Sequence, residues 1–565
     1  MASRAALYLD TAKRLKASQI AGRARRLVPP RLLAAGLRAT STADWSPIPG
    51  GLGANIAPQS GPTDPPHETG YLEAVGHRRR ADEPGFWQDD RDGLLFLFHL
   101  HGFDALASFA AAPRTPAGDE FWIGLVRDWL TANDAIRGPG WHPHPTSVRM
   151  IAWAGSLPLL DEWPAELRAR IAGEVARQGR YLTRCIEHDI GGNHVLKNAT
   201  ALCFAGSLLP QTGLLGRGLS LLQAELPKQL LEDGGHVERS TAYHREIGHD
   251  LSEVAELLAR GGRTVPDWLE DCLRRATAWQ EALVGPDMRL PLLNDAWDGP
   301  PEPNRKTTDR TVLGESGYAV LRHERHQLVF DAGPLSADHL PPHAHADALS
   351  LTLCWDGVPV LVDPGAFSYT GPRRAEFRST AAHNTVEVDG QDQCVFWGDF
   401  RLAFPPRVRG PVIADVDGGT ILLGSHDGYA RLASPACHQR AVVWLPGDGV
   451  ICLDRLLSRS AHRVRSALVA APGLPVTPGR IGDLQLQALG EAGPWQMEAA
   501  SYAPWLGTAQ ATSRLVNEAS PSPGSIFGWS LLRSGVAVQR FVDDAVVIDA
   551  AGQQRTIQIP WNALL

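Results

Sequence analysis

Several common signals are absent from this chain of 565 residues. Its seven cysteines are scattered and form no CxxC pair, which excludes the usual paired-cysteine zinc motifs and predicts reduced, mostly buried thiols. No segment carries the roughly 18 apolar residues that a membrane span needs, so we expect no transmembrane helix. The formal net charge of −8 is modest for this length and argues against nucleic acid as the main partner.

The apolar core of a signal peptide is also missing. The first residues, MASRAALYLDTAKRLKASQIAGRARRL, are basic and amphipathic, and they predict a helical arm over residues 1–40. Two interpretations of this arm are open: contact with anionic lipid or an acidic polymer, or a solvated surface helix. The missing signal peptide favours a cytoplasmic protein, with a periplasmic or envelope-associated location as the alternative.

What is present is an ordinary globular composition with many tryptophans. Apolar residues make up 44% of the chain and charged residues 21%, which is typical of a soluble globular protein. The length exceeds one hydrophobic core and predicts two or more domains. Seventeen tryptophans against eight tyrosines are compatible with surfaces that stack on sugars and equally with a tryptophan-rich core.

The hydrophobic period changes once along the chain. Residues 41–300 show helical spacing, most clearly over 165–188, and short Gly/Pro breaks predict antiparallel helices in a bundle or an (α/α) toroid. Residues 44–92 are rich in Pro, Gly and charge and are expected to be irregular. Residues 311–565 show a period of two and Asp-Gly turns, which predict an antiparallel β-sandwich. The predicted class is therefore α+β multidomain, with its boundary in the Pro-rich stretch 295–311.

Histidines and aspartates gather between residues 341 and 393. His343 and His345 are two apart and share one face of an extended strand, and Asp363 ends the apolar run VPVLV. Imidazoles and carboxylates that converge on a rigid sheet suit a divalent metal or proton transfer. The alternative is that each of them is an ordinary hydrogen-bonded residue of the core or the surface.

Two further clusters lie in the helical half. The first, GGNHVLKN, places Asn193 and His194 at a helix N-terminus, where Asn193 is alternatively a simple cap. The second, ERSTAYHREIGHD, contains Tyr243 and His244 at the start of a helix. An aromatic residue beside a histidine is also typical of core packing, so spacing alone leaves both clusters open.

Taken together, these motifs resemble one family. GGNHVLKN, STAYHREI, HAHADALSL, VDPGAFSY and FRSTAAHNTVEVDGQDQ follow one another as in the heparinase II/III-type polysaccharide lyases, to which alginate lyases with an α/α toroid and a β-sandwich are related. The similarity covers roughly residues 141–393. It implies an enzyme that removes the C5 proton of a uronic acid and expels the O4-linked sugar, at a site where the two domains meet.

The resemblance implies roles for four residues. Asn193 and His194 match the positions that neutralise the uronate carboxylate, so that the charge of an enolate-like intermediate is stabilised. Tyr243 matches the tyrosine that donates a proton to O4 and that can also be the base for one C5 epimer. His343 matches the histidine that is the base for the other epimer or assists Tyr243.

A metal ion is implied as well. His345, Asp363 and His383 match the ligands of a zinc ion that lies in the sandwich of better-known members. Its expected task is structural, because it would fix the strand that presents His343. Hydrogen bonding without any metal is the alternative for these side chains.

The expected substrate surface consists of Lys197, His244 and Arg378. Lys197 departs from the family pattern, since many relatives carry a glutamate at this position. A lysine there would tighten binding of an anionic polymer or indicate a different substrate, and its alternative is a side chain that faces solvent.

Two functions follow from these expectations. The first is a lyase that cleaves a uronic-acid-containing polysaccharide by β-elimination, with an acidic polysaccharide or oligosaccharide as its partner. The second is an altered relative: a hydrolase that uses the same cleft, or a non-catalytic carbohydrate-binding protein in bacterial exopolysaccharide synthesis or export. The basic N-terminal arm resembles that of relatives thought to accompany such synthesis.

Overall fold

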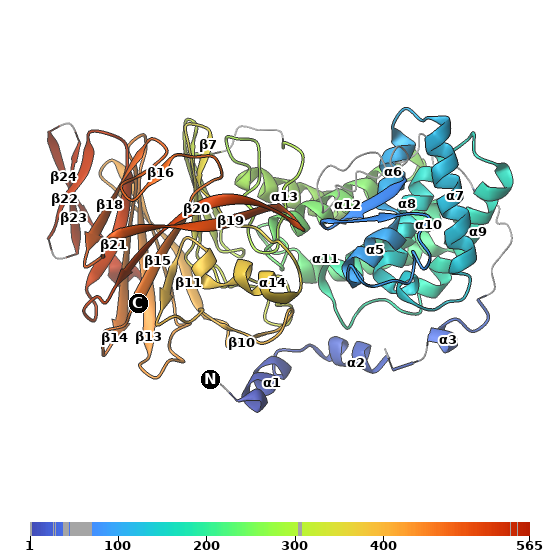
Figure 1. The fold of residues 1–565 in the computed structure, drawn as a ribbon, viewed down its shortest axis with the longest axis horizontal. Helices are drawn as coiled ribbons and strands as arrows, with labels where there is room; N and C mark the ends of the chain where they lie inside the picture. Colours follow the sequence, from blue (N-terminus) through green and yellow to red (C-terminus); the bar gives the residue numbers. More distant parts are fainter. Residues whose placement is uncertain are drawn as a thin grey trace.

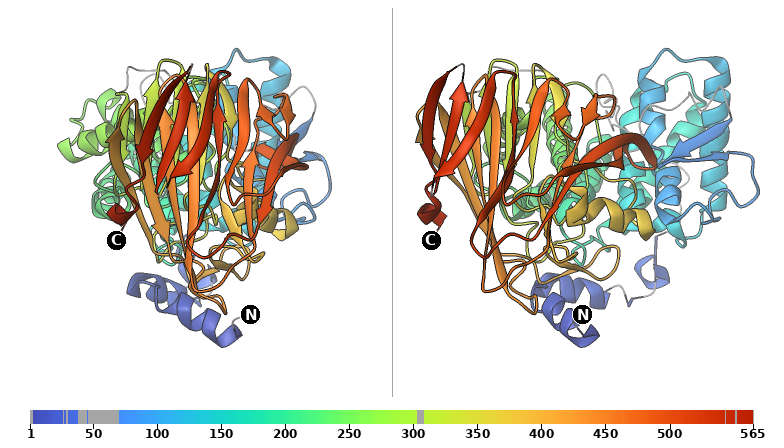
Figure 2. Two further views of the ribbon diagram at one scale, coloured as in Figure 1. Left: turned by 90° about the vertical axis from the view of Figure 1, so that its left-hand side faces the viewer. Right: turned by 60° about the vertical axis from the view of Figure 1, so that its left-hand side comes forward.

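The structure is a computed structural model that describes residues 3–25, 27–28, 30–37, 45, 70–302, 308–542, 544–550 and 552–564. Helices occupy one end of the molecule and antiparallel sheets the other, while the N-terminal helices lie along one side of both (Figure 1). In the two views of Figure 2 these N-terminal helices again lie outside the sheets. The chain therefore passes from the arm to the helices and then to the sheets, in the order that the sequence predicts.

The helices form the first half of the molecule, and we call α5–α13 the helical domain. In chain order they are α1 (Arg4–Ala12), α2 (Ala17–Arg25), α3 (Pro30–Leu33), α5 (Leu94–Gly102), α6 (Asp104–Ala111), α7 (Pro116–Ala132), η1 (Pro139–Trp141), α8 (Pro143–Ser156), η2 (Leu157–Leu159), α9 (Ala165–Leu182), α10 (Gly192–Leu208), η3 (Pro210–Thr212), α11 (Leu214–Gln229), α12 (Thr241–Arg260) and α13 (Asp267–Leu283). Within the sheets lie α14 (Gly371–Arg378), η4 (Thr380–Ala382) and η5 (Trp561–Leu564).

Local signals explain where the functionally important helices start and stop. Ser240 is the N-cap of α12 and its hydroxyl accepts from the Tyr243 backbone N–H at 3.2 Å, which places Tyr243 in the first turn. Helix α9 buries its apolar stripe as predicted, but it ends at Leu182 rather than near residue 188. Turns then lead to Gly191, the N-cap residue of α10.

One apolar segment meets the length and composition of a membrane span. Residues Leu94–Ala111 have a mean hydropathy of 1.5, which differs from the expectation that no segment would qualify. The segment is divided into α5 and α6 at Phe103, whose φ is 58°, and 56% of it is buried inside the protein. A buried core helix passes the same test, so this is weak support for a span.

Antiparallel strands form the second half, which we call the sandwich. The strands are β3 (Arg310–Leu313), β4 (Tyr318–His323), β5 (His326–Asp331), β6 (Leu351–Trp355), β7 (Val358–Leu361), β8 (Val386–Val388), β9 (Val395–Phe396), β10 (Leu402–Ala403), β11 (Val408–Val416), β12 (Gly419–His426), β13 (Ala436–Leu445), β14 (Gly449–Ser458), β15 (Val464–Val469), β16 (Val476–Thr477), β17 (Arg480–Ile481), β18 (Leu484–Gly490), β19 (Trp495–Trp505), β20 (Thr508–Ala519), β21 (Ile526–Leu532), β22 (Val536–Val542), β23 (Ala545–Ala550) and β24 (Gln553–Gln558).

These strands make layered sheets around a shared core. A five-stranded sheet has the order β3-β4-β5-β6-β7, an eight-stranded sheet β11-β12-β13-β14-β21-β18-β17-β16, and a four-stranded sheet β19-β20-β15-β8, beside a three-stranded sheet β22-β23-β24. One buried cluster joins the first three sheets and includes Leu328, Leu353, Val442, Leu468 and Trp529. The predicted turn at Asp356-Gly357 joins β6 and β7, and both residues have the positive φ that such a turn requires.

A long hairpin connects the sandwich to the helical domain. The strands β19 and β20 extend toward the helices in Figure 1. Their turn meets the turn of the short hairpin β1 (Tyr71–Ala74) and β2 (His77–Arg80), where a Cβ on Gly76 would lie 2.7 Å from the Gly507 carbonyl oxygen. This hairpin is an ordered part of the stretch 44–92 that was expected to be irregular, while residues 46–69 lie outside the described residues.

Candidate active site between the helical domain and the sandwich

A cavity of about 1170 Å³ lies where the helices and the sheets meet. The N-terminal arm, the β1–β2 turn, helices α10 and α12, the loop before the HAHAD motif and the β19–β20 turn all contribute to its lining. Its walls include five predicted site residues, Asn193, His194, Lys197, Tyr243 and His343. Residues from both domains thus come together in one space.

The start of α10 is shaped by two glycines. Gly191 and Gly192 have φ values of 80° and 56°, and a Cβ on Gly192 would lie 1.9 Å from Glu238 Oε1. Without that Cβ, Glu238 accepts hydrogen bonds from the Asn193 backbone N–H at 3.1 Å and from Asn193 Nδ2 at 3.2 Å. Asn193 is therefore not the helix cap, because Gly191 occupies that position. Its side chain is held by a buried carboxylate at the edge of the cavity.

A second buried carboxylate holds His194. Glu187 Oε1 lies 3.2 Å from His194 Nδ1, and Glu187 Oε2 accepts from Asn198 Nδ2 at 3.0 Å. Burial alone would raise the pKa of Glu187, but the nearby His194 ring holds it down at about 2, so the group is ionised. Because Nδ1 of His194 is hydrogen-bonded to Glu187, its Nε2 is the ring nitrogen that can contact substrate.

Another histidine lies beside this pair. The rings of His144 and His194 have centroids 4.8 Å apart, and Nδ1 of His144 is buried with no hydrogen-bond partner among the described residues. The donor atoms of His144, Glu187 and His194 lie within 4.8 Å of one another, so this group has the composition of a metal site as well as that of an oriented histidine.

Tyr243 is paired with a tyrosine from the sandwich. The two phenol oxygens of Tyr243 and Tyr369 lie 2.6 Å apart, and the ring of Tyr243 lies 4.2 Å from that of His343. Burial raises the pKa of both tyrosines well above the ordinary value, so both are neutral phenols at neutral pH. Tyr369 belongs to the VDPGAFSY motif, but the sequence alone did not single it out.

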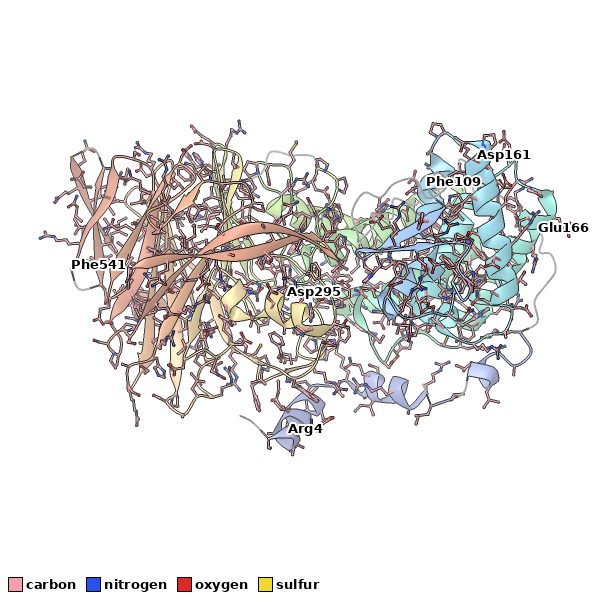
Figure 3. The ribbon with its side chains drawn as sticks, viewed as in Figure 1. Arg4, Phe109, Asp161, Glu166, Asp295 and Phe541 are labelled. Atoms are coloured by element: carbon pink, nitrogen blue, oxygen red, sulfur yellow. The ribbon has the colours of Figure 1, made fainter. Side chains whose placement is uncertain are left out.

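His343 is fixed by Asp295, which also went unnoticed in the sequence. His343 Nδ1 lies 2.9 Å from Asp295 Oδ2, and Asp295 is fully buried at the junction of the two domains (Figure 3). Burial opposes ionisation of Asp295, but Arg374 and the two neighbouring histidines hold its pKa well below the usual range. The other ring nitrogen of His343 lies 3.7 Å from Glu238 Oε2, on the cavity side.

The predicted metal ligands converge behind His343. His345, Asp363 and His383 are all buried, and one donor atom of each lies within 4.8 Å of the others. His345 Nδ1 and His383 Nε2 face each other at 3.1 Å. The outer nitrogen of each histidine, which points away from the other ring, already has a hydrogen-bond partner. His345 Nε2 lies 3.0 Å from Asp295, and His383 Nδ1 lies 2.7 Å from the Ser379 carbonyl.

These contacts leave two lone pairs pointing at each other. A carbonyl and an ionised carboxylate only accept, so the outer nitrogens carry the hydrogens, while burial lowers the pKa of His345 to about 4 and that of His383 to about 3. Neither neutral imidazole can then donate to the other. Burial and the nearby Asp347 raise the pKa of Asp363 well above its ordinary value, because both disfavour a negative charge on this carboxyl group. A divalent cation with nitrogen and oxygen ligands fits this donor set.

The three predicted substrate-binding residues do not lie together in the structure. Lys197 lines the cavity, but its ammonium lies 2.7 Å from Asp250 Oδ2, so its charge is compensated inside the protein. Burial alone would lower the pKa of Lys197, whereas Asp250 and Glu246 raise it above the ordinary value. The alternative of a lysine that faces solvent does not hold for this side chain.

His244 and Arg378 are not among the residues that line the cavity. His244 is buried beside Trp279, with ring centroids 4.1 Å apart, and its Nε2 donates to the Ala276 carbonyl at 2.9 Å. Arg378 is buried over the ring of Phe396, and it donates to the Asp399 carbonyl at 2.6 Å. The expectation that both touch substrate does not fit their positions, because α12 turns His244 toward α13 and α14 turns Arg378 into the sandwich.

Two family models match the chain. The one described as Heparinase II/III N-terminus matches residues 161–311, and the one described as Heparinase II/III-like, C-terminal matches residues 305–542. Together they cover more than half of the chain.

Curated relatives match over shorter stretches. The chain is 28% identical over 290 residues to FtsZ-localized protein C of Caulobacter vibrioides, which is 50% of this chain and 46% of that protein. It is 26% identical over 225 residues to the heparin-sulfate lyase of Bacteroides thetaiotaomicron, which is 35% of this chain and 31% of that protein. The matches thus span about half or less of the length of these relatives.

Solved structures match over nearly the whole chain. A crystal structure of heparinase III superposes with a TM-score of 0.73 at 16% identity and covers 95% of both chains. A mutant of heparan sulfate lyase HepC from Pedobacter heparinus superposes with a TM-score of 0.62 at 17% identity, over 96% of this chain and 95% of that one. At such identities the likeness shows the fold, and the predicted class of a toroid followed by an antiparallel sandwich is confirmed.

Proposed function

Because the chain belongs to the heparinase II/III-like family, we propose that it is a polysaccharide lyase that cleaves a uronic-acid-containing polymer by β-elimination. One observation carries the proposal: Tyr243 of the helical domain and His343 of the sandwich lie with their rings 4.2 Å apart in a cavity that Asn193 and His194 also line. The heparinase III fold and the heparin-sulfate lyase relative support the class of reaction.

The first step is neutralisation of the uronate carboxylate. Asn193 Nδ2 has two hydrogens, one of which Glu238 accepts, and the second is directed to the substrate carboxylate. His194, held at Nδ1 by Glu187, presents Nε2 to the same carboxylate. Both groups are positioned before substrate binds, so they stabilise the negative charge that develops when the C5 proton leaves.

The proton transfers are divided between His343 and Tyr243. Asp295 holds Nδ1–H of His343, so the lone pair on Nε2 accepts the C5 proton. The C5–H electron pair forms the C4–C5 double bond, and the C4–O4 bond breaks. Tyr243 is neutral because its pKa is raised by burial, so it is suited to donate its proton to the departing O4, and Tyr369 can return a proton to it.

The group of His345, Asp363 and His383 would hold a divalent cation, for which zinc is our proposal, outside the proton-transfer path. The ion would supply a fixed crosslink inside the sandwich. Since Asp295 contacts both His345 and His343, these residues transmit that rigidity to the base.

A spectroscopic screen tests the proposal. Purified protein is incubated with a panel of acidic polysaccharides, including alginate and heparan sulfate, and with Tyr243→Phe as the matched control. Elimination produces a conjugated unsaturated uronate with strong ultraviolet absorbance, and the expected result is such absorbance with at least one polymer and far less with the variant. New reducing ends without absorbance would indicate the alternative hydrolase, and binding without either product would indicate the non-catalytic relative.

A further inference from the structure

The N-terminal arm contacts both domains along one face, although Gln19 is its one buried residue within α1 and α2. On the sandwich side, Trp397 Nε1 donates to Thr11 Oγ1 at 3.2 Å, and the rings of Tyr8 and Trp397 lie 4.7 Å apart. On α2, Gln19 is 4% exposed, and its Nε2 donates to the Ile190 carbonyl of the helical domain at 3.4 Å and to the His339 carbonyl of the sandwich at 3.0 Å. Helices α1 and α2 therefore contact both domains beside the cavity, and they lie along one side of both domains in Figure 1.

One face of the arm is a wall of the cavity. The arm residues that line the cavity recur every three or four positions, as on one side of a helix: Tyr8, Thr11, Ala12, Leu15, Gln19 and Arg23. The stripe continues across the break between α1 and α2. Since the same cavity holds Tyr243 and His343, the arm faces the space where the proposed substrate binds.

The arm also brings positive charge to the cavity, because Arg23 lies on its wall. Residues 1–40 contain nine Lys or Arg residues and one Asp, whereas the whole chain has a formal net charge of −8. Around the cavity the helical domain contributes carboxylates, among them Asp189 and Glu246, and the ammonium of Lys197 is paired with Asp250. The basic arm therefore offsets part of the negative charge that a polyanion would meet at this opening.

Two exposed guanidinium groups lie on the cavity wall. Arg23 is exposed on α2, and Arg401 is exposed in the turn between β9 and β10, next to Leu402, whose carbonyl accepts from Thr11 and Arg14 of the arm. Within the described residues, neither Arg23 nor Arg401 forms a salt bridge. Arg401 lies over the ring of Trp397 at 4.7 Å, which orients its planar group.

We propose that the arm completes the substrate site, and that Arg23 and Arg401 bind acidic groups of the polymer away from the bond that is cleaved. The inference rests on the proposed function and adds to it two residues that bind units of the polymer beyond the one at the reaction centre. Arginine suits this role because its planar fork pairs with carboxylate and sulfate through two hydrogen bonds.

The test separates binding along the arm from chemistry. Arg23→Gln, Arg401→Gln and the double variant are compared with Lys13→Gln, which removes an exposed arm charge that does not line the cavity. KM and kcat are measured for a long polymer and for the shortest oligosaccharide that is still cleaved. Each arginine variant is expected to raise KM for the polymer roughly three- to tenfold, with kcat and the short substrate unchanged. Lys13→Gln is expected to change neither.

A binding measurement keeps the two proposals distinguishable. Titration of wild type and variants with alginate, which carries only carboxylates, and with heparan sulfate, which also carries sulfates, reports the arginine contacts without any turnover. Weaker binding of either polymer by the arginine variants supports the inference even if no polymer is eliminated, in which case the proposed function alone would fail. Arginine variants that match Lys13→Gln in both assays, or that impair short and long substrates equally, would overturn the role of the arm.

Discussion

The phenol oxygens of Tyr243 and Tyr369 lie 2.6 Å apart, although the two residues are 126 positions apart in sequence and belong to different domains. Tyr243 starts α12, and Tyr369 follows the strand β7 in the sandwich. The proposed proton donor therefore has its hydrogen-bond partner across the domain boundary. Neither domain alone contains the complete pair.

Replacing the two tyrosines one at a time distinguishes the role of the proton donor from that of its hydrogen-bond partner. Tyr243→Phe keeps the ring but removes the proton that is donated to O4, so turnover is expected to fall by roughly a hundredfold or more. Tyr369→Phe removes only the partner of that proton, and a smaller loss, roughly tenfold, is expected. Both are measured as kcat on a polymer that wild type eliminates. Wild-type turnover in Tyr243→Phe would show that the donor is a different group.

Asp295→Asn tests whether the buried carboxylate orients the base. An amide cannot accept from His343 with the same charge, so the ring loses its fixed tautomer, and kcat is expected to fall by about a hundredfold or more with a displaced pH profile. Asp298→Asn is the matched control, because Asp298 lies in the same segment but pairs with half-exposed Arg289. If both variants retained the wild-type pH profile, Asp295 would be structural only.

Metal content can be assigned to one of the two candidate groups. Purified protein is expected to hold about one zinc per chain, which His345→Ala removes and His144→Ala retains. Since a metal bound only to the folded state stabilises it, chelation or His345→Ala is expected to cost about 3 kcal/mol when free metal is a hundredfold above its Kd. Elemental analysis and thermal melts measure both quantities. Protein without stoichiometric metal, with an unchanged Tm in His345→Ala, would remove the site from consideration.

His244 is expected to act on stability rather than on catalysis. Burial lowers its pKa to about 3 in the folded protein, whereas an unfolded histidine titrates near 6.5. Between these values the unfolded chain binds the additional proton, so this contribution to stability is present above pH 6.5 and is lost progressively as the pH falls. From pH 7 to pH 5, wild type is expected to lose about 2 kcal/mol more than His244→Gln.

Denaturant titrations at the two pH values check this, with turnover at neutral pH as the second readout. Glutamine keeps a nitrogen donor that can reach the Ala276 carbonyl, so the variant is expected to fold and to turn over substrate normally. Equal pH dependence in the two proteins, or a selective loss of kcat in the variant, would contradict the assignment of His244 to the core.

The order of helices and sheets could be predicted because periodicity is a local property. The Asp356-Gly357 turn was read from two residues, and both have the positive φ that the turn needs. The end of α9 at Leu182 was missed, since the apolar spacing continues to Ile186 although that residue is only partly buried outside the helix. Spacing alone cannot tell a helical residue from one that packs in a following turn.

The carboxylates that hold the candidate site could not be found in the same way. An aspartate in a Pro-rich linker looks solvated, yet Asp295 is fully buried and contacts His343 from 48 positions away. Glu187 lies only seven residues before His194, close to the GGNHVLKN motif, and that proximity was the available signal. An amphipathic basic arm likewise has the same pattern whether it faces water or the wall of a cavity.

The docking of the arm has a consequence for how the protein matures during synthesis. Thr11 is made well before Leu402, because the Leu402 carbonyl that its hydroxyl contacts is 391 positions later in the sequence. At about 5–20 residues per second, the ribosome therefore finishes the first helix tens of seconds before its docking surface exists. The cavity gains its last wall only after both domains have folded, so premature termination anywhere before residue 402 yields a chain with an open, incomplete site.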